Sequence, residues 1–357
     1  MKKIVFIFLL IILTSLTSYA HSNIYKAVVL DVEVVESQKD DIFITSQNVK
    51  VKIINGKYKN TTIEVKNNFS GNPAYDINVE KGDKVLIDIN EDENGNIQAY
   101  ITDYARDEYI YYLTLVFILL LVFIGRFKGI KTIITLFITI GCIYKILLPF
   151  ILKGYNPIFV TILTSYVIVV LTITIISGIS KKSLSAILGT LLGIMVAGFI
   201  SYYVGTKIKL TGLSSEEAMM LAYVKEYFDF RGLLFAGILL GALGAIMDVS
   251  MSIASSIEEI SNANKKLTSY ELFSAGMNVG KDIMGTMANT LILAYTGSSI
   301  PLLILFMAYN TSFVKVINLD VIATEIVRAL SGSIGLILTI PITAGIAAYL
   351  SKLNKNT

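Results

Sequence analysis

Hydrophobic and polar positions follow two different patterns along this chain of 357 residues. Residues 24–104 alternate apolar with polar side chains, the period of half-buried β-strands. From Tyr109 onward, long apolar runs alternate with short polar loops, and each run can cross about 30 Å of hydrocarbon as a helix. These runs predict about seven transmembrane helices, at residues 109–125, 132–150, 157–178, 184–204, 231–256, 284–308 and 321–350.

The alternating segment predicts a small N-terminal all-β domain over residues 22–105. Five short strands in about 80 residues are typical of an OB-like barrel, and a β-sandwich fragment is the alternative. Asn55-Gly56, between two of the strands, predicts a hairpin turn. No catalytic constellation is visible in this domain, so we interpret it as a binding or gating module.

The first 20 residues, MKKIVFIFLLIILTSLTSYA, predict a secretory signal peptide. Lys2 and Lys3 precede an apolar core, and Ser18-Tyr19-Ala20 offers a small-x-small cleavage site. An uncleaved anchor helix is the alternative. In both cases the β domain lies outside the cytoplasm, and seven spans then place the C-terminal tail, residues 351–357, in the cytoplasm.

The composition is that of a multi-pass protein of the plasma or inner membrane. Hydrophobic residues make up 54% of the chain and charged residues 16%, whereas a soluble domain is about 25% charged. The loops after the first and third predicted spans carry basic clusters, which modestly favours placing them inside. A net charge of +3, without basic clusters interleaved with aromatics, does not indicate nucleic acid. The expected partners are the lipid bilayer and a small solute or ion of unknown identity.

The single cysteine, Cys142, and the single histidine, His21, restrict the chemistry. A disulfide framework and a zinc site of several His or Cys ligands are excluded, so we expect no metal and no cofactor. A Ser–His dyad within the membrane has no histidine to use. The motif of intramembrane aspartyl proteases is absent at both Asp248 and Asp282, so we do not expect an enzyme.

A carboxylate interrupts the apolar run GALGAIMDVSMSIASSIEEI, residues 241–260. Asp248 shares a helix face with Gly237, Gly241 and Ser252, because residues three and four apart are neighbours on a helix. A charge at membrane depth costs about 2.5–3.5 kcal/mol on insertion scales, so it usually faces a partner, a cavity or a pathway. Gly237 and Gly241 form a small-xxx-small pair, which predicts close packing against another helix.

A second polar stripe follows in the next predicted span and the amphipathic stretch before it. We expect Lys281, Asp282, Thr286 and Asn289 to form an ion-relay or transport pocket with Asp248 and Ser252. A structural salt bridge from Asp248 to Lys281 is the alternative, and it would explain these charges without transport. The stretch before residue 284 is predicted to lie on the inner membrane surface.

The last predicted span carries a third stripe. Glu325 and Arg328 are three residues apart, so they can pair on one helix face, and they are candidates for an outer gate or a structural ion pair. Gly332 and Gly335 continue this face as predicted helix-packing positions. In the span before it, residues 297–301 contain Gly, Ser and Pro and predict a local break.

Three late segments carry a resemblance to a known family. GALGAIMDVSMSIASSIEEI, GMNVGKDIMGTMANTLILAYTGSSIPLL and EIVRALSGSIGLILTIPITAGIAAYL resemble the YibE/F family of bacterial membrane proteins, over about residues 110–350. This resemblance implies a topology and little mechanism. The order of an outer domain, an Asp in a Gly-rich helix and two final Ser/Gly-rich spans is similar to one half of a resistance-nodulation-division permease, SecD and SecF in particular. At the level of fold analogy, that similarity assigns Asp248 to the position of a proton-relay carboxylate.

Two functions remain open at this point. The first is a proton- or ion-coupled transporter or permease that uses Asp248. The second is a non-transporting scaffold or accessory protein whose β domain binds an extracytoplasmic protein partner.

Overall fold

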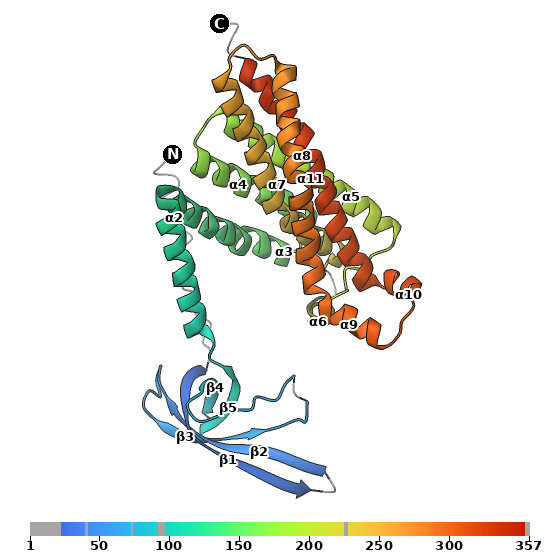
Figure 1. Ribbon diagram of the computed structural model, residues 1–357. Coiled ribbons are helices and arrows are strands. Elements are labelled where there is room, and N and C mark those ends of the chain that lie inside the picture. Colours follow the sequence, from blue (N-terminus) through green and yellow to red (C-terminus); the bar gives the residue numbers. More distant parts are fainter. Residues whose placement is uncertain (1–22, 40–41, 73, 92–96, 225–227, 354–357) are drawn as a thin grey trace. The chain divides into compact units, whose positions relative to one another are not determined.

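The computed structural model describes residues 23–39, 42–72, 74–91, 97–224 and 228–353 (Figure 1). The described residues form two compact units, which divide between Ile124 and Gly125. The predicted signal peptide, residues 1–20, and the last four residues of the C-terminal tail lie outside the described residues.

Five strands build the N-terminal unit, and every paired neighbour is antiparallel. The sheet order is β3-β2-β1-β4-β5. The strands are β1 (Ile24–Lys39), β2 (Ile42–Ile53), β3 (Thr62–Asn68), β4 (Lys84–Glu91) and β5 (Ile97–Tyr104). The hairpin predicted at Asn55-Gly56 is confirmed, because this turn joins β2 to β3 and Gly56 has a φ of 69°, which favours glycine.

The core of this unit consists of the apolar members of the alternating pattern. Val49, Val51 and Ile53 alternate along β2 and are fully buried, and Val85 and Ile87 do the same on β4. The two edge strands, β3 and β5, contact each other, so the sheet curls into a half-barrel around this core. The prediction of a small five-stranded β domain is therefore confirmed, and its OB-like topology stays a prediction.

The second unit is helical, and its first helix begins in the N-terminal unit. Helix α2 (Asp107–Cys142) breaks at Arg126, where φ is 49° and ψ is −126°, close to the division between the units. The remaining elements are a π-helical turn (Ile143–Leu147), α3 (Leu148–Leu152), α4 (Pro157–Ser177), α5 (Lys181–Lys207), α6 (Glu216–Val224), α7 (Phe230–Ala263), α8 (Ser269–Ser298), α9 (Ile300–Ala308), α10 (Phe313–Ile317) and α11 (Asp320–Lys352).

Five helical segments of the described chain are long and apolar enough to cross a membrane. They are Asp107–Leu152, α4, α5, α7 and α11, and the bent pair α8–α9 makes a sixth if it counts as one span. The first segment holds two of the predicted spans, 109–125 and 132–150, with the Arg126 break between them. The count of seven therefore stays a prediction.

Helix α11 is the centre of the helical unit, since it packs against α5, α7 and α8 (Figure 1). Small residues permit these close contacts. A Cβ at Gly335 would lie 2.6 Å from the Cβ of Ala197 and 2.9 Å from the carbonyl oxygen of Gly193, so α5 and α11 nearly touch through their backbones.

Helix α8 corrects one expectation about the region before residue 284. A capping box of Thr268 and Glu271 starts the helix, and it then runs without interruption to Ser298. Gly276 and Gly280 pack against Ile257 of α7 and Ile340 of α11, so this stretch belongs to the bundle and is not a separate surface helix. The break predicted at residues 297–301 is confirmed, because α8 and α9 are bent by 59° there.

Candidate functional site

The carboxylate of Asp248 lies on an exposed edge of α7. Gly237, Gly241, Asp248 and Ser252 are exposed along this edge, whereas the rest of the α7 surface between Gly232 and Ile257 is largely buried against its neighbours. The predicted common face of these residues is therefore present. Asp248 and Ser252 face the outside of the described bundle, whereas Gly241 lies against the hydroxyl of Tyr295 on α8 and Gly237 borders a cavity of about 420 Å³.

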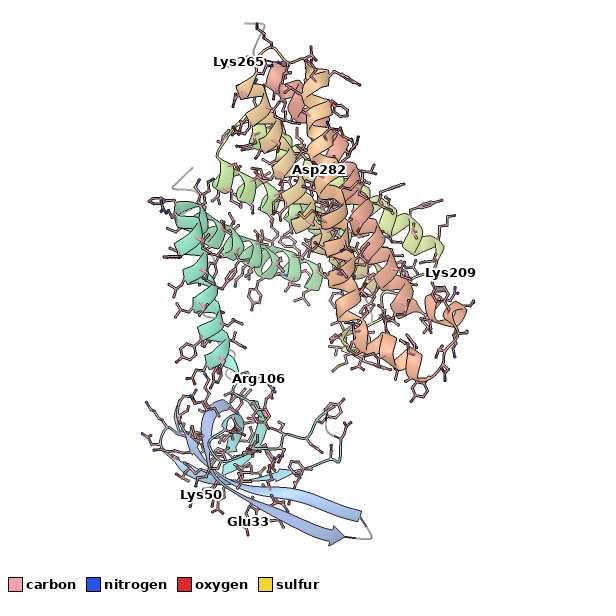
Figure 2. All side chains as sticks on the ribbon, viewed as in Figure 1. Glu33, Lys50, Arg106, Lys209, Lys265 and Asp282 are labelled. Atoms are coloured by element: carbon pink, nitrogen blue, oxygen red, sulfur yellow. The ribbon has the colours of Figure 1, made fainter. Side chains whose placement is uncertain are left out.

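The second stripe is also exposed. Lys281, Asp282, Thr286 and Asn289 all lie on the outer side of α8 (Figure 2, where Asp282 is labelled). The buried strip of α8 consists instead of Leu272, Gly276, Gly280 and Leu291. An enclosed pocket of Asp248, Lys281 and Asp282 is therefore not formed within the described chain, because the buried strip of α8 is apolar and its polar residues fall outside it.

Helices α7 and α8 run antiparallel and place their polar stripes at similar heights. Gly241 of α7 lies against the hydroxyl of Tyr295, and Ile257 lies against Gly276 of α8. Between these two contacts, Asp248 is level with the region around residues 285–288. The two stripes therefore occupy neighbouring surfaces of the bundle.

The alternative of a structural salt bridge from Asp248 to Lys281 is not met. Among the described residues, the Asp248 carboxylate makes no ion pair and accepts no hydrogen bond. The same holds for the ammonium of Lys281 and the carboxylate of Asp282. These three charges are not used to hold the bundle together.

The polar groups inside the helical unit are of another kind. Its buried polar side chains, within the described range, are all serine or threonine hydroxyls, and no charged side chain is fully buried there. Several bond the carbonyl one turn earlier, as Thr190 does with Ala186 (2.7 Å) and Ser250 with Ile246 (2.9 Å). The bundle interior is thus neutral, and its charges lie at its surface and ends.

The third stripe forms an ion pair beside two cavities. Arg328 Nη1 lies 3.3 Å from Glu325 Oε1 in an ion pair, which confirms the predicted pairing, and the ring of Tyr295 lies 5.8 Å from the guanidinium carbon. Glu325 and Ser299 line both a cavity of about 240 Å³ and one of about 420 Å³. Glu325 Oε2 and Arg328 Nε are buried without a protein partner among the described residues. The role of this pair as an outer gate stays a prediction.

The predicted packing glycines differ from one another. Gly332 lies beside Ala242 of α7, and Gly335 makes the tight contact with α5 described above. Gly241 meets the hydroxyl of Tyr295. By contrast, no described heavy atom lies within 4 Å of where a Cβ on Gly237 would be, and this glycine lines the cavity of about 420 Å³.

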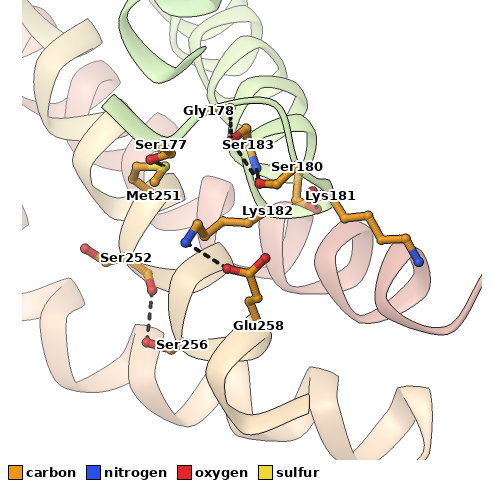
Figure 3. A network of polar contacts seen from close by, with 11 residues as sticks. Ser177, Gly178, Ser180, Lys181, Lys182, Ser183, Met251, Ser252, Ser256 and Glu258 are labelled. Atoms are coloured by element: carbon orange, nitrogen blue, oxygen red, sulfur yellow. Dashed lines mark hydrogen bonds and ion pairs between the residues drawn. The ribbon is translucent and has the colours of Figure 1, made fainter. Parts of the chain in front are cut away.

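An ion pair between helices was missed by sequence reasoning. Lys182 Nζ lies 2.7 Å from Glu258 Oε2 and joins the start of α5 to the last turns of α7 (Figure 3). The pair borders a cavity of about 180 Å³, which Lys181, Ser185 and Asn262 also line. The sequence does place both residues on the same predicted side of the membrane. Spacing along one helix, however, does not identify ion pairs between two helices.

Comparison with known protein families covers nearly the whole chain. Residues 113–353 match the YibE/F-like protein family, and residues 19–104 match the N-terminal domain of the YibE/F family. No curated protein and no solved structure matches the chain significantly. The two matches correspond to the helical and β regions, and together with the long apolar helices they indicate a membrane protein. The chain therefore belongs to the YibE/F family.

Proposed function

We propose that this protein is a proton- or ion-coupled permease of the plasma or inner membrane, in which Asp248 binds and releases the coupling ion. The observation that carries the proposal is an acidic side chain midway along an apolar helix that pairs with no described group. A carboxylate used for structure would be expected to have a basic or hydrogen-bonding partner, because an unpaired charge at membrane depth is costly.

The chemistry follows from the two states of a carboxylic acid. In the charged state Asp248 attracts a proton or a metal cation, and once neutralised it is much less costly to expose to an apolar environment. Ser252, one turn further along α7, offers a hydroxyl on the same face. Alternating exposure of this face to the two sides would couple ion movement to the movement of a solute.

The proposal also assigns a role to the opposite end of the helical unit. The Glu325–Arg328 pair and its two cavities would form the outer mouth, and the β unit would lie outside the cytoplasm with the C-terminus inside. The cavity lining supports this assignment, because Glu325 borders both cavities and Arg328 borders the larger one, so a passing solute or water would meet charged side chains there.

Ion uptake into vesicles tests the proposal. The full-length protein is reconstituted, and proton uptake (an internal pH-sensitive dye) and ²²Na⁺ uptake are measured under an imposed membrane potential. We expect one of the two rates to exceed that of empty vesicles, to fall to the empty-vesicle level in Asp248→Asn, and to be retained in Glu259→Gln, which removes an exposed carboxylate near the end of the same helix. Wild-type rates in Asp248→Asn would remove Asp248 from the mechanism.

A further inference from the structure

Helix α8 carries a polar face that no described residue covers. Asn278, Lys281, Asp282, Gly285, Asn289 and Thr296 are all exposed, and we call them the α8 polar face. We propose that this face is the contact surface for a second copy of the same chain, so that the membrane-embedded unit is a two-fold symmetric dimer. This inference requires α8 to cross the bilayer but does not depend on transport.

Exposing the α8 polar face to lipid would cost free energy. The α8 polar face contains two charged side chains and two amides within about three helical turns, starting two to three turns from the beginning of the helix. Hydrocarbon cannot satisfy such groups, and ionisable residues in spans therefore face protein or a water-filled cavity. Within the described chain neither Lys281 nor Asp282 has an ion-pair partner, so the covering groups must come from elsewhere.

The glycines of α8 lie on both its buried side and its polar face. Gly276 and Gly280, on the buried side, are already filled by side chains, since a Cβ there would meet Ile257 and Ile340. Gly285, on the α8 polar face, has no described heavy atom within 4 Å of its Cβ position. Small residues at helix contacts let two backbones approach closely. Helix α8 therefore already packs through Gly276 and Gly280 inside the bundle, and Gly285 leaves room for another helix at the α8 polar face.

A second copy of the chain fits this face best, because the charges of the face are self-complementary. On a helix with 3.6 residues per turn, Lys281 lies about 60° to one side of Asn278 and Asp282 about 40° to the other. When two parallel copies of α8 meet along the Asn278–Gly285–Asn289 line, opposite flanks face each other. Lys281 then faces the partner's Asp282 at nearly equal depth, and the symmetry repeats the pair.

The amide side chains fit the same arrangement. Identical chains inserted in the same direction bring equal residues to equal depth, so Asn278 and Asn289 each meet their own copy. An amide carries both donors and an acceptor, so two asparagines can hydrogen-bond each other. A merely apolar helix is a poor alternative occupant, because its side chains offer no group that could pair with Lys281 or Asp282.

Complementary charge variants test the pairing directly. Lys281→Asp makes both flanks acidic, and Asp282→Lys makes both flanks basic, so each variant repels its own copy. A mixed dimer of one Lys281→Asp chain and one Asp282→Lys chain regains two opposite-charge pairs. Two differently tagged full-length chains are co-expressed and extracted from membranes, and co-purification is measured. We expect several-fold less self-association of either variant than of wild type, and recovery in the mixed pair.

Co-purification recovers in the mixed pair only if the two chains contact each other through the α8 polar face. An ion pair within one chain would not be restored by the charges of the other chain. Equal co-purification in all combinations, or no association of wild type, would overturn the proposal. Expression and monodispersity of each variant alone show that it folds, and the mixed pair serves as the matched control for any loss in either single variant.

Disulfide cross-linking in intact membranes gives an independent measurement. Cys142, which is buried, is first replaced by alanine, so that Asn289→Cys supplies the only thiol. We expect oxidation to produce a covalent dimer for Asn289→Cys and none for Met195→Cys, whose side chain is 57% exposed on α5. Equal yields at both positions would contradict the proposal, as would no covalent dimer for Asn289→Cys.

Discussion

Single glycines decide how closely the central helices can approach. Gly335 of α11 sits against Gly193 and Ala197 of α5 with no room for a methyl group. Gly345, ten residues further along α11, has no described heavy atom within 4 Å of its Cβ position. Both glycines lie in α11, but only Gly335 is closely packed. Replacing each of them by alanine therefore separates the effect of a steric clash from the effect of helix propensity.

Gly335→Ala is therefore expected to destabilise the helical unit by about 1–3 kcal/mol, the usual cost of overpacking. Gly345→Ala is expected to be neutral or to stabilise by up to about 1 kcal/mol, because alanine favours the helix. Thermal unfolding in detergent, followed by size-exclusion chromatography of heated samples, measures both. An unchanged melting temperature in Gly335→Ala would show that α5 can move away without cost.

At this scale the sequence predicts faces but not what covers them. Spacing of three and four residues correctly placed Asp248 with Ser252 on one side of a helix, and paired Glu325 with Arg328. It did not predict that Asp248 and Lys281 lie at the outside of the described bundle, because exposure depends on which helices pack together. The Lys182–Glu258 pair was missed for the same reason.

The loop before β4 shows how one element depends on a single carboxylate. Asp76 accepts hydrogen bonds from the backbone N–H of Ser70 (2.6 Å), the hydroxyl of Ser70 (2.8 Å) and the backbone N–H of Gly71 (2.9 Å). These bonds, chiefly the one from the Ser70 backbone, hold the pKa of Asp76 below its usual value. The charged form is thus favoured in the folded β unit.

A lowered pKa in the folded state fixes the direction of the pH dependence. The stabilisation is complete above the unfolded pKa of about 3.9 and is lost as the pH falls through the lower folded value. Asp76→Asn should lower the melting temperature of residues 23–105 at pH 6, and its deficit should shrink toward pH 2. Circular dichroism melts measure this, with Glu64→Gln on β3 as the control. A deficit that stays constant with pH would contradict it.

Elements were predicted well where their pattern was long and regular. The five strands lie where the alternating pattern placed them. The stretch before residue 284 was wrongly separated from α8, because its amphipathic pattern is also that of a helix packed on one side. The half-barrel curvature of the sheet follows from bulges and edge contacts, which alternation does not encode.

The whole molecule combines two units whose cores are separate. The β unit buries its own apolar set, including Val49, Val51 and Ile87, within five strands. Residues 23–105, expressed without the helical unit, are therefore expected to fold alone and unfold in a single cooperative transition. Circular dichroism and amide dispersion in a two-dimensional NMR spectrum measure this. An unfolded spectrum would show that the strands need the helical unit.

At the scale of the whole molecule, we propose that ion transport depends on the carboxylate charge of Asp248 and not on the shape of its side chain. The most direct test compares ion uptake in vesicles for Asp248→Asn, which keeps the shape and removes the charge, with Asp248→Glu, which keeps the carboxylate. We predict that the asparagine variant transports no faster than empty vesicles and that the glutamate variant retains measurable uptake. Wild-type uptake in the asparagine variant would contradict the account.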